Sequence, residues 1–267
     1  MSVFHQRIVW ITGASSGIGE ALALELARQG ARLILSARRA DELHRVAAAT
    51  GLPPADLLVL PLDVTDEAAL PRQVDTVLTR FGRIDYVFQN AGITQRSFVN
   101  DTEMSVYQRL MAVNFFGVVA LTKAVLPHFL LQKSGHFVVT SSVSGKIGVK
   151  QRSGYCASKH ALHGFFDSLR AETANDGLRV TLICPGYIRT PISQSALDAT
   201  GRAYGKSDRA QAQGMPADQC ARRILRAVAA GREEVYVGGR ELLGVYLKRF
   251  FPAVLSRILR NRAVEAS

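Results

Sequence analysis

Three side chains suited to carbonyl or alcohol chemistry gather in residues 140–159, TSSVSGKIGVKQRSGYCASK. Tyr155 and Lys159 stand four residues apart at the start of a helical pattern, so a helix presents the phenol and the ammonium on one face. Ser142 follows the apolar run 137–139, which is typical of a buried strand. Open parallel sheets bind their ligands at the carboxyl ends of the strands. A phenol, an ammonium and a hydroxyl at such an end suit proton transfer to or from a carbonyl or alcohol oxygen.

A tyrosine followed four residues later by a lysine is, by itself, more often a solvated helix face than a catalytic pair. Of the seven tyrosines, however, only Tyr155 has a lysine at that spacing, and it follows the serine-rich exit of a strand. Whether a redox cofactor binds beside this stretch must therefore be inferred from the motifs in the rest of the chain.

The first expected strand, residues 8–12, runs into the sequence TGASSGIG, and a helical pattern follows over residues 20–29. Gly13, Gly17 and Gly19 allow a tight turn and let the helix N-terminus approach a pyrophosphate, because its free N–H groups and its dipole favour an anion. A simple tight turn is the alternative interpretation. The position of the glycines between a strand and a helix favours dinucleotide binding.

The second expected strand, residues 33–36, predicts which dinucleotide is bound. An acidic residue at this strand end takes the ribose hydroxyls of NAD, whereas an arginine receives the 2′-phosphate of NADP. The acidic position is empty here, and Arg38 and Arg39 follow the strand. We expect NADP(H) to be preferred, with NAD(H) as the alternative cofactor and two solvated arginines as the alternative interpretation.

Strands alternate with helical patterns along the whole chain, which predicts a doubly wound parallel α/β sheet covered by helices on both faces. Helices are expected over residues 66–81, 103–131 and 155–174, and strands over 57–62, 180–183 and 234–237. Pro127 is expected to kink or end its helix. Asn114 lies among apolar neighbours, where a buried amide is costly unless it is hydrogen-bonded. The length of 267 residues suits one domain over residues 1–267.

Two segments depart from this alternation. Residues 187–215 turn polar, small and glycine-bearing, which predicts a substrate lid. Residues 242–262 form a helical tail that is both apolar and basic and is interrupted by Pro252. This tail could touch an anionic membrane, cover the substrate pocket, or pack on the body or on a partner subunit.

The composition narrows the class of protein. The net charge is +11, from 33 basic and 22 acidic residues, but no helix-turn-helix or zinc-finger spacing supports nucleic acid as a ligand. The three cysteines are too few and too scattered for a disulfide framework or a metal site, which fits a reducing compartment. No signal peptide and no uninterrupted apolar run of transmembrane length is evident. We therefore expect a cytoplasmic protein, with peripheral membrane contact through the tail as a further option.

Taken together, the motifs and their order in the chain resemble those of the short-chain dehydrogenases/reductases. The resemblance covers nearly the whole length of the chain. The matching motifs are the loop at residues 12–19, Asp63-Val64, Asn90-Ala91-Gly92, Asn114, Ser142, the YCASK sequence at 155–159 and Pro185-Gly186. Within the family, residues 143–146 and the basic tail are most similar to the branch around mammalian 11β-hydroxysteroid dehydrogenase and its retinal or steroid reductase relatives.

The resemblance implies a Rossmann-type sheet of seven strands and a catalytic tetrad of Asn114, Ser142, Tyr155 and Lys159. In this scheme Tyr155 is the general acid in reduction and the base in oxidation, and Ser142 donates a hydrogen bond to the substrate oxygen. Lys159 holds the nicotinamide ribose and, together with the oxidised nicotinamide, favours the phenolate of Tyr155. Asn114 resembles the residue that anchors a water linking Lys159 to solvent.

The resemblance also implies the residues that contact the cofactor. These are Gly13, Ser15, Ser16, Gly17, Ile18, Gly19, Arg38, Asp63, Val64, Asn90, Ala91, Gly92, Tyr155, Lys159, Pro185, Gly186, Ile188 and Thr190. Many NADP-binding members carry a basic residue before the second glycine of the loop, but here that residue is Ser16, so the preference for NADP(H) depends mainly on Arg38.

The expected activity is hydride transfer between NADP(H) and a small hydrophobic ketone or aldehyde or its alcohol. The alternatives are a non-catalytic nucleotide-sensing protein on the same fold and an NAD(H)-dependent alcohol dehydrogenase. The family implies a homo-dimer or homo-tetramer. No metal and no nucleic acid is expected.

Overall fold

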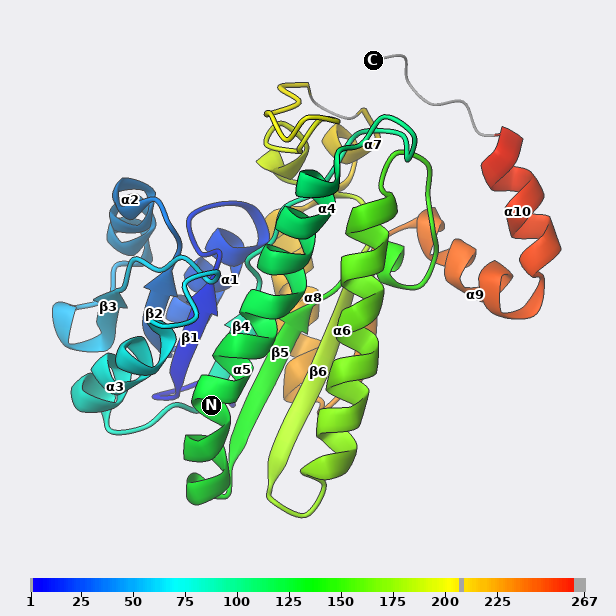
Figure 1. The fold of residues 1–267 in the computed structure, drawn as a ribbon. Helices are drawn as coiled ribbons and strands as arrows, with labels where there is room; N and C mark the ends of the chain where they lie inside the picture. The colour runs from blue at the N-terminus through cyan, green and yellow to red at the C-terminus, as the bar shows by residue number, and fades with distance from the viewer. Residues whose placement is uncertain (1, 207–208, 262–267) are drawn as a thin grey trace.

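The computed structural model describes residues 2–206 and 209–261. Its centre is a parallel sheet of seven strands in the order β3-β2-β1-β4-β5-β6-β9 (Figure 1). The strands are β1 (Ile8–Thr12), β2 (Arg32–Ser36), β3 (Leu57–Val59), β4 (Tyr86–Gln89), β5 (Gly135–Thr140), β6 (Leu178–Pro185) and β9 (Glu234–Val237). The order of the strands reverses between β1 and β4, so their carboxyl ends open a crevice there. The predicted doubly wound sheet is confirmed.

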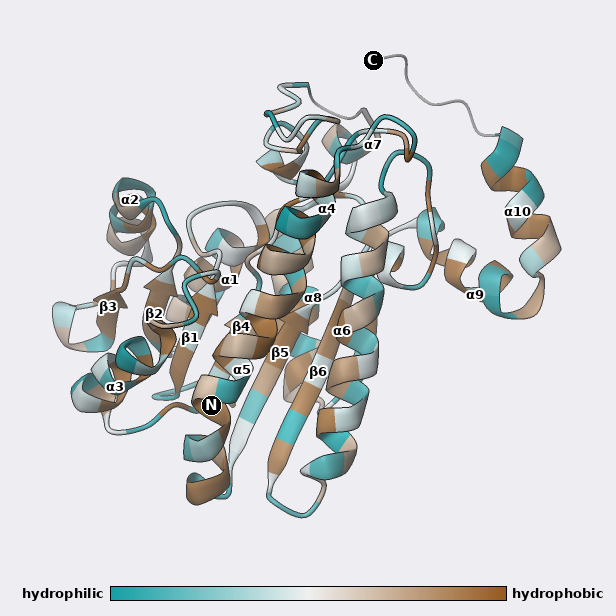
Figure 2. Cartoon of the chain, in the orientation of Figure 1, coloured by the Kyte–Doolittle hydropathy of each residue, from teal (hydrophilic) through white to brown (hydrophobic). Residues whose placement is uncertain are grey.

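Helices cover both faces of the sheet because the strands are apolar on both sides, as their brown colour in Figure 2 shows. One face packs against α1 (Gly17–Arg28), α2 (Ala40–Thr50) and α8 (Ala217–Ala229). The other face packs against α3 (Leu70–Phe81), α5 (Gly117–Gln132) and α6 (Ser153–Glu172). Alternate residues of β1 supply the two cores, with Val9 and Ile11 on the first face and Trp10 on the second.

The helix expected over residues 103–131 is a continuous helical stretch with three parts. These are α4 (Met104–Met111), a π-helical turn (Ala112–Phe116) and α5. Pro127 lies inside α5, which continues to Gln132, so the prediction that it ends the helix is wrong. Pro127 is exposed, whereas Val125 and Phe129 on the inner face are fully buried, so packing of the inner face stabilises the helix beyond the proline.

By length and hydropathy, the stretch Met104–Gln132 could cross a membrane. Polar residues such as Asn114 and Lys123 divide this stretch, so it contains no uninterrupted apolar run of transmembrane length. Its inner face packs into the second core through Val118, Leu121 and other buried side chains. We therefore assign it as a helix of the folded body.

Two other predicted boundaries are wrong. The helix expected from residue 66 begins at Leu70, because residues 66–69 form turns stabilised by the Asp66 carboxylate, which accepts a hydrogen bond from Ala69 N at 3.3 Å. The strand expected to reach residue 62 ends at Val59. Leu60 and Leu62 nevertheless continue to donate backbone hydrogen bonds to Leu35 and Ala37.

The polar segment 187–215 and the tail 242–262 lie beside the carboxyl ends of the strands. The polar segment 187–215 pairs β7 (Ile188–Arg189) with β8 (Met215–Pro216) and contains the short helix α7 (Arg209–Ala212). Residues 207–208 of this segment and Arg262 of the tail lie outside the described residues. The tail forms α9 (Leu243–Phe250) and α10 (Pro252–Asn261), which break at Pro252 as predicted.

Candidate active site

The serine, tyrosine and lysine of the 140–159 stretch meet at the carboxyl end of β5. Ser142 leaves β5 in an extended conformation and begins a 3-10 turn (Val143–Gly145), where its Oγ accepts a hydrogen bond from Ser144 N at 3.0 Å. Tyr155 and Lys159 lie on successive turns of α6, and the Ser142 side chain is close enough to the phenol to influence its pKa. Helical spacing therefore places the two groups as the sequence predicts.

Lys159 is buried, with 3% of its surface exposed, and its Nζ donates a hydrogen bond to Thr140 O at 2.7 Å. Burial disfavours the charged form and lowers the pKa of Lys159 to about 8. Its Nζ lies 6.0 Å from the centre of the Tyr155 ring. The amine thus lies within the same site as the phenol and can gain or lose a proton near neutral pH.

Asn114 occupies the π-helical turn and is fully buried. Its Oδ1 accepts from Ile93 N at 2.9 Å, and its Nδ2 donates to Ile93 O at 2.9 Å and to Ser158 Oγ at 3.0 Å. A Cβ at Gly92 would lie 3.2 Å from Asn114 Oδ1 and 3.5 Å from Lys159 Nζ, so both side chains flank this glycine. Asn114 is a fully hydrogen-bonded amide that also lies beside Lys159. A π-turn at such a position is common in functional sites.

The protein alone shifts the pKa of the Tyr155 phenol upward, whereas the expected stabilisation of its anion involves the oxidised nicotinamide as well as Lys159. Burial raises the pKa of Tyr155, and this outweighs the influence of the Ser142 side chain and the positive charges of Arg152 and Arg96, which act in the opposite direction. The Lys159 ammonium does not reverse this, because burial disfavours its own charge as well. In this chain the phenol is therefore protonated at neutral pH and ready to donate.

The glycine-rich loop lies directly against the turn that follows β4. Gly13 and Gly17 have φ angles of +66° and +61°, which side chains rarely adopt. A Cβ at Gly13 would lie 2.9 Å from Ala91 Cα, and one at Gly17 would lie 2.9 Å from Thr190 Cγ2. Asn90 Nδ2 also donates to Gly13 O at 3.3 Å. These close approaches leave the free N–H groups of α1 open to a pyrophosphate.

Arg38 and Arg39 are exposed at the end of β2 and border the same cavity. The positive charge of Arg38 acts on the Asp63 carboxylate. Partial desolvation of Asp63 opposes its ionisation, but hydrogen bonds from Thr65 and the charges of Arg38 and Arg109 outweigh this effect, so the pKa of Asp63 is lowered. Arg39 donates to Ser15 Oγ at 3.3 Å. Arg39 is not among the cofactor contacts that the resemblance implies, although its position next to Arg38 in the sequence indicates that both can reach the cavity.

These residues share a cavity of about 1190 Å³. Among the predicted site residues, Gly19 and Asn114 do not line it. Gly19 packs behind the loop, where a Cβ would lie 2.1 Å from Gly13 O, so its absence of a side chain lets α1 approach the strand. Glycines at positive φ, a helix N-terminus and two arginines fit a phosphorylated dinucleotide.

The other end of the cavity is apolar, and sequence motifs did not predict it. Val143, Ile147 and Val149 line it from the loop after β5, and the tail closes it through Leu247, Leu255 and Leu259. Leu255 is 5% exposed and belongs to a small core with Val143 and Ile147. Of the positions that the sequence left open for the tail, the structure places it on the body, through this small core, and along the wall of the cavity. The sequence signal was the apolar face of residues 242–262.

Comparison with known proteins gives consistent matches. The family described as short chain dehydrogenase matches residues 7–200. A Drosophila melanogaster protein named dehydrogenase/reductase SDR family protein 7-like is 43% identical over 97% of this chain and 81% of its own length. Human dehydrogenase/reductase SDR family member 7 is also 43% identical, over 92% of this chain and 74% of the human protein.

Two solved structures are similar in fold. One is a short chain dehydrogenase/reductase from Burkholderia phymatum in complex with NAD, with a TM-score of 0.84 and 25% identity over the full length of both chains. The other is levodione reductase, with a TM-score of 0.80 and 30% identity over 90% of this chain and 99% of the reductase.

Proposed function

Because this chain belongs to the short-chain dehydrogenase/reductase family of oxidoreductases, we propose that it interconverts a hydrophobic ketone or aldehyde and the corresponding alcohol with NADP(H). One observation carries the proposal. Ser142, Tyr155 and Lys159 lie between a cradle suited to a dinucleotide and an apolar chamber, within one cavity. A substrate oxygen held there reaches the phenol while its carbon skeleton contacts apolar side chains.

The residues of the chain can perform the proton transfer and the charge stabilisation. NADP(H), when bound, supplies or accepts the hydride. In reduction, Tyr155 donates its proton to the carbonyl oxygen as that oxygen becomes basic, and the raised pKa of the phenol ensures that the proton is present at neutral pH. The Ser142 hydroxyl, whose bond to Pro185 O is long at 3.4 Å, can turn to donate to the same oxygen as charge develops. In oxidation the phenolate takes the proton from the alcohol.

Lys159 prepares the phenol for its next proton transfer. Its Nζ donates to Thr140 O and lies beside the Tyr155 ring, and burial brings its pKa to about 8. An amine in this range can exchange protons at neutral pH, and its charged form stabilises the phenolate that remains after reduction.

The two arginines after β2 support NADP(H) as the cofactor. Arg38 and Arg39 border the cavity, and no carboxylate stands at the strand end to accept the ribose hydroxyls of NAD. Asp63 is the neighbouring acid, and its charge is balanced by Arg38 and Arg109. The relative from Burkholderia phymatum binds NAD, so an NAD(H)-dependent alcohol dehydrogenase is the competing function.

Paired titrations with NADPH and NADH, followed by nicotinamide fluorescence, test the proposal. We expect NADPH to bind at least tenfold more tightly, about 1.4 kcal/mol, and Arg38→Ala to remove most of that difference. Arg72→Ala is the control. This substitution removes the same charge, but Arg72 is exposed on α3 and does not line the cavity. Tighter binding of NADH would support the alcohol dehydrogenase, and binding of neither would exclude a nicotinamide enzyme.

The outer face of the tail supports peripheral contact with an anionic membrane as a second part of the proposal. Tyr246, Phe250 and Phe251 are 57–67% exposed on α9 and just after it. Four exposed basic side chains lie on the same two helices, α9 and α10: Lys248, Arg249, Arg257 and Arg260. An exposed apolar ridge with a basic fringe suits the surface of a bilayer that carries anionic lipids. A cytoplasmic protein at such a surface would receive hydrophobic substrates beside the mouth of the cavity.

A further inference from the structure

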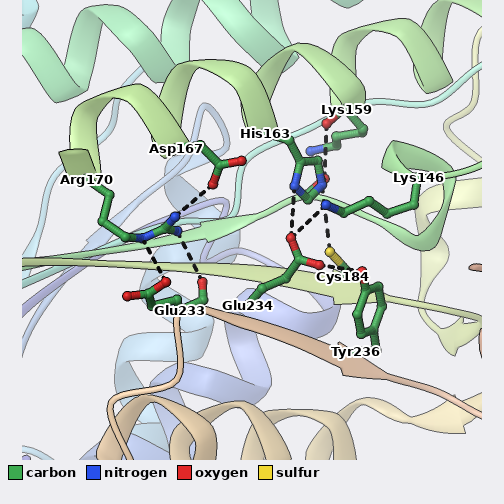
Figure 3. Close-up of polar contacts among 10 residues, drawn as sticks. Lys146, Lys159, His163, Asp167, Arg170, Cys184, Glu233, Glu234 and Tyr236 are labelled. Atoms are coloured by element: carbon green, nitrogen blue, oxygen red, sulfur yellow. Dashed lines mark hydrogen bonds and ion pairs between the residues drawn. The ribbon is translucent and has the colours of Figure 1, made fainter. Parts of the chain in front are cut away.

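A cluster of polar side chains links the loop that carries Ser142 to β9 and α6 (Figure 3). Its centre is Glu234, the first residue of β9. The Glu234 carboxylate lies 2.7 Å from Lys146 Nζ and 3.3 Å from His163 Nδ1, and it accepts a hydrogen bond from the Tyr236 hydroxyl. None of the family motifs predicts these contacts.

The carboxylate of Glu234 is held in its charged form. Burial opposes ionisation, but the neighbouring His163 and Lys146 side chains and the hydrogen bond from Tyr236 together lower the pKa of Glu234 to about 2. Its side chain is only 28% exposed, so the surrounding donors and not water provide most of its partners. A neutral side chain of the same size would lose the attraction for Lys146 and His163.

His163 connects this carboxylate to the catalytic loop. It lies on α6 one turn after Lys159, and its Nε2 is 3.0 Å from Ser141 Oγ. Ser141 Oγ also donates to Lys159 O at 3.1 Å. The contacts therefore run from Glu234 to the residue before Ser142 and to the helical turn that carries Lys159.

Lys146 fixes the other end of the same loop. It follows the 3-10 turn and donates its backbone N–H to Val143 O at 3.0 Å. The turn is packed tightly, because a Cβ at Gly145 would lie 2.5 Å from Ser141 Oγ and 3.1 Å from His163 Nε2. One carboxylate thus fixes the loop on both sides of Ser142.

Donor atoms of His163, Cys184 and Glu234 lie within 4.8 Å of one another, which raises the alternative of a metal site. Glu234 meets Nδ1 of the imidazole, however, whereas Cys184 Sγ lies 3.8 Å from Nε2. One ion cannot bind both nitrogens of a single ring, and the Lys146 ammonium already neutralises the carboxylate. Burial also raises the pKa of Cys184 to about 12, so the thiol keeps its proton. The geometry favours a hydrogen-bonded support for the loop.

We infer that Glu234, acting through His163 and Lys146, is a positioning residue that holds the Ser142 hydroxyl opposite the Tyr155 phenol. This inference rests on the proposed reaction. A hydroxyl that stabilises developing charge is effective only when its position is fixed before the reaction, and a misplacement of about 1 Å can cost roughly a hundredfold in rate.

The test compares Glu234→Gln with Glu233→Gln in the full chain. Glu233 precedes Glu234, is 71% exposed and has its contact with Arg170 at 3.9 Å, so its substitution removes the same charge without touching the loop (Figure 3). We expect Glu234→Gln to lower kcat at least tenfold, leave the Kd for NADPH within twofold, and increase deuterium uptake in residues 141–147. Glu233→Gln should match the wild type in all three measurements.

Wild-type kcat and wild-type deuterium uptake in Glu234→Gln would overturn the inference, as would a lower Tm with unchanged kcat per folded enzyme. Lys146→Met is the second variant and is used if Glu234→Gln does not fold, because it frees the same loop at a side chain that is 26% exposed. If the wild type reduces no carbonyl compound, the proposed function fails, and the deuterium uptake alone still decides whether Glu234 holds the loop.

Discussion

At the scale of single residues, the protonation states of Tyr155 and Lys159 define what the site can do. Burial raises the pKa of the phenol and lowers the pKa of the amine to about 8. At neutral pH the phenol therefore keeps its proton, whereas the amine, with a pKa of about 8, is still mostly charged and can release a proton readily. This arrangement favours reduction of a carbonyl, in which the phenol gives up its proton first.

Replacing Tyr155 by phenylalanine should abolish turnover while leaving the fold and the cofactor site intact. We expect kcat to fall by about a hundredfold or more, the range attributed to general acid catalysis, with the Kd for NADPH within twofold of wild type. Steady-state kinetics and fluorescence titration measure the two quantities. Tyr107→Phe is the control, because Tyr107 contacts Ser153 on α6 and does not line the cavity. A Tyr155→Phe enzyme with nearly normal turnover would contradict the acid role of Tyr155, whereas a wild type that binds NADPH without any turnover would favour a nucleotide-sensing protein.

Lys159 should make the stability of the protein depend on alkaline pH. Its folded-state pKa of about 8 is below the ordinary value of 10.5, so the unfolded chain binds more protons between these values and the free energy of unfolding rises with pH there. We expect wild type to gain on the order of 3 kcal/mol relative to Lys159→Met between pH 8 and pH 10.5, with the penalty fully present below pH 8. Urea unfolding of both proteins at pH 7 and pH 10 measures this difference. A constant difference would show that the amine is charged in the folded protein.

At the scale of elements, α10 presents two faces with different tasks. Leu255 points into the small core beside the cavity and is 5% exposed, whereas its neighbour Val254 is 50% exposed and does not line the cavity. The helix is tied to the body at its far end by Lys150 Nζ, which donates to Arg260 O at 2.8 Å. The element therefore closes the substrate chamber with one face and leaves the other to solvent or to a membrane.

Aspartate substitutions at these two neighbours should separate the two tasks. Leu255→Asp buries a charge in the core and should raise the KM for a hydrophobic ketone at least tenfold, with cofactor binding unchanged. Val254→Asp should leave KM unchanged and weaken sedimentation with vesicles that contain phosphatidylserine. Kinetics and vesicle sedimentation are measured on both variants. Equal sedimentation of wild type and Val254→Asp, or sedimentation of neither, would argue against the membrane contact.

At the scale of the whole molecule, association of two or more copies stays a prediction. The outer surface of α5 and the turn before it exposes Phe116 by 52% and Leu131 by 86%, beside α6 (Figure 1). Light scattering of the purified protein should give the mass of a dimer or tetramer, and Phe116→Glu should reduce it. Met104→Glu is the control, because Met104 is 68% exposed on α4 and carries the same substitution. A monomer in the wild type would contradict the prediction.

The sequence by itself determined the parts of the site that are local in the chain. The spacing of Tyr155 and Lys159 fixes their common helix face, and the glycines between β1 and α1 fix the shape of the loop, because each depends only on backbone geometry over a few residues. The alternation of strands and helices likewise predicts the doubly wound sheet. These features carry the family resemblance and the class of reaction.

Only the tertiary structure decided what depends on contacts between distant segments. Glu234 lies next to His163 because β6, which carries Cys184, pairs with both β5 and β9, and no local pattern encodes that neighbourhood. The tail covers the cavity for a similar reason, since an apolar helix face can pack on any apolar partner until the fold presents one. The course of α5 past Pro127 was also decided by packing, because burial of Val125 and Phe129 outweighs the hydrogen bond that proline removes. Local geometry depends on residues that are neighbours in the sequence, whereas the burial of a side chain is determined only when the chain has folded.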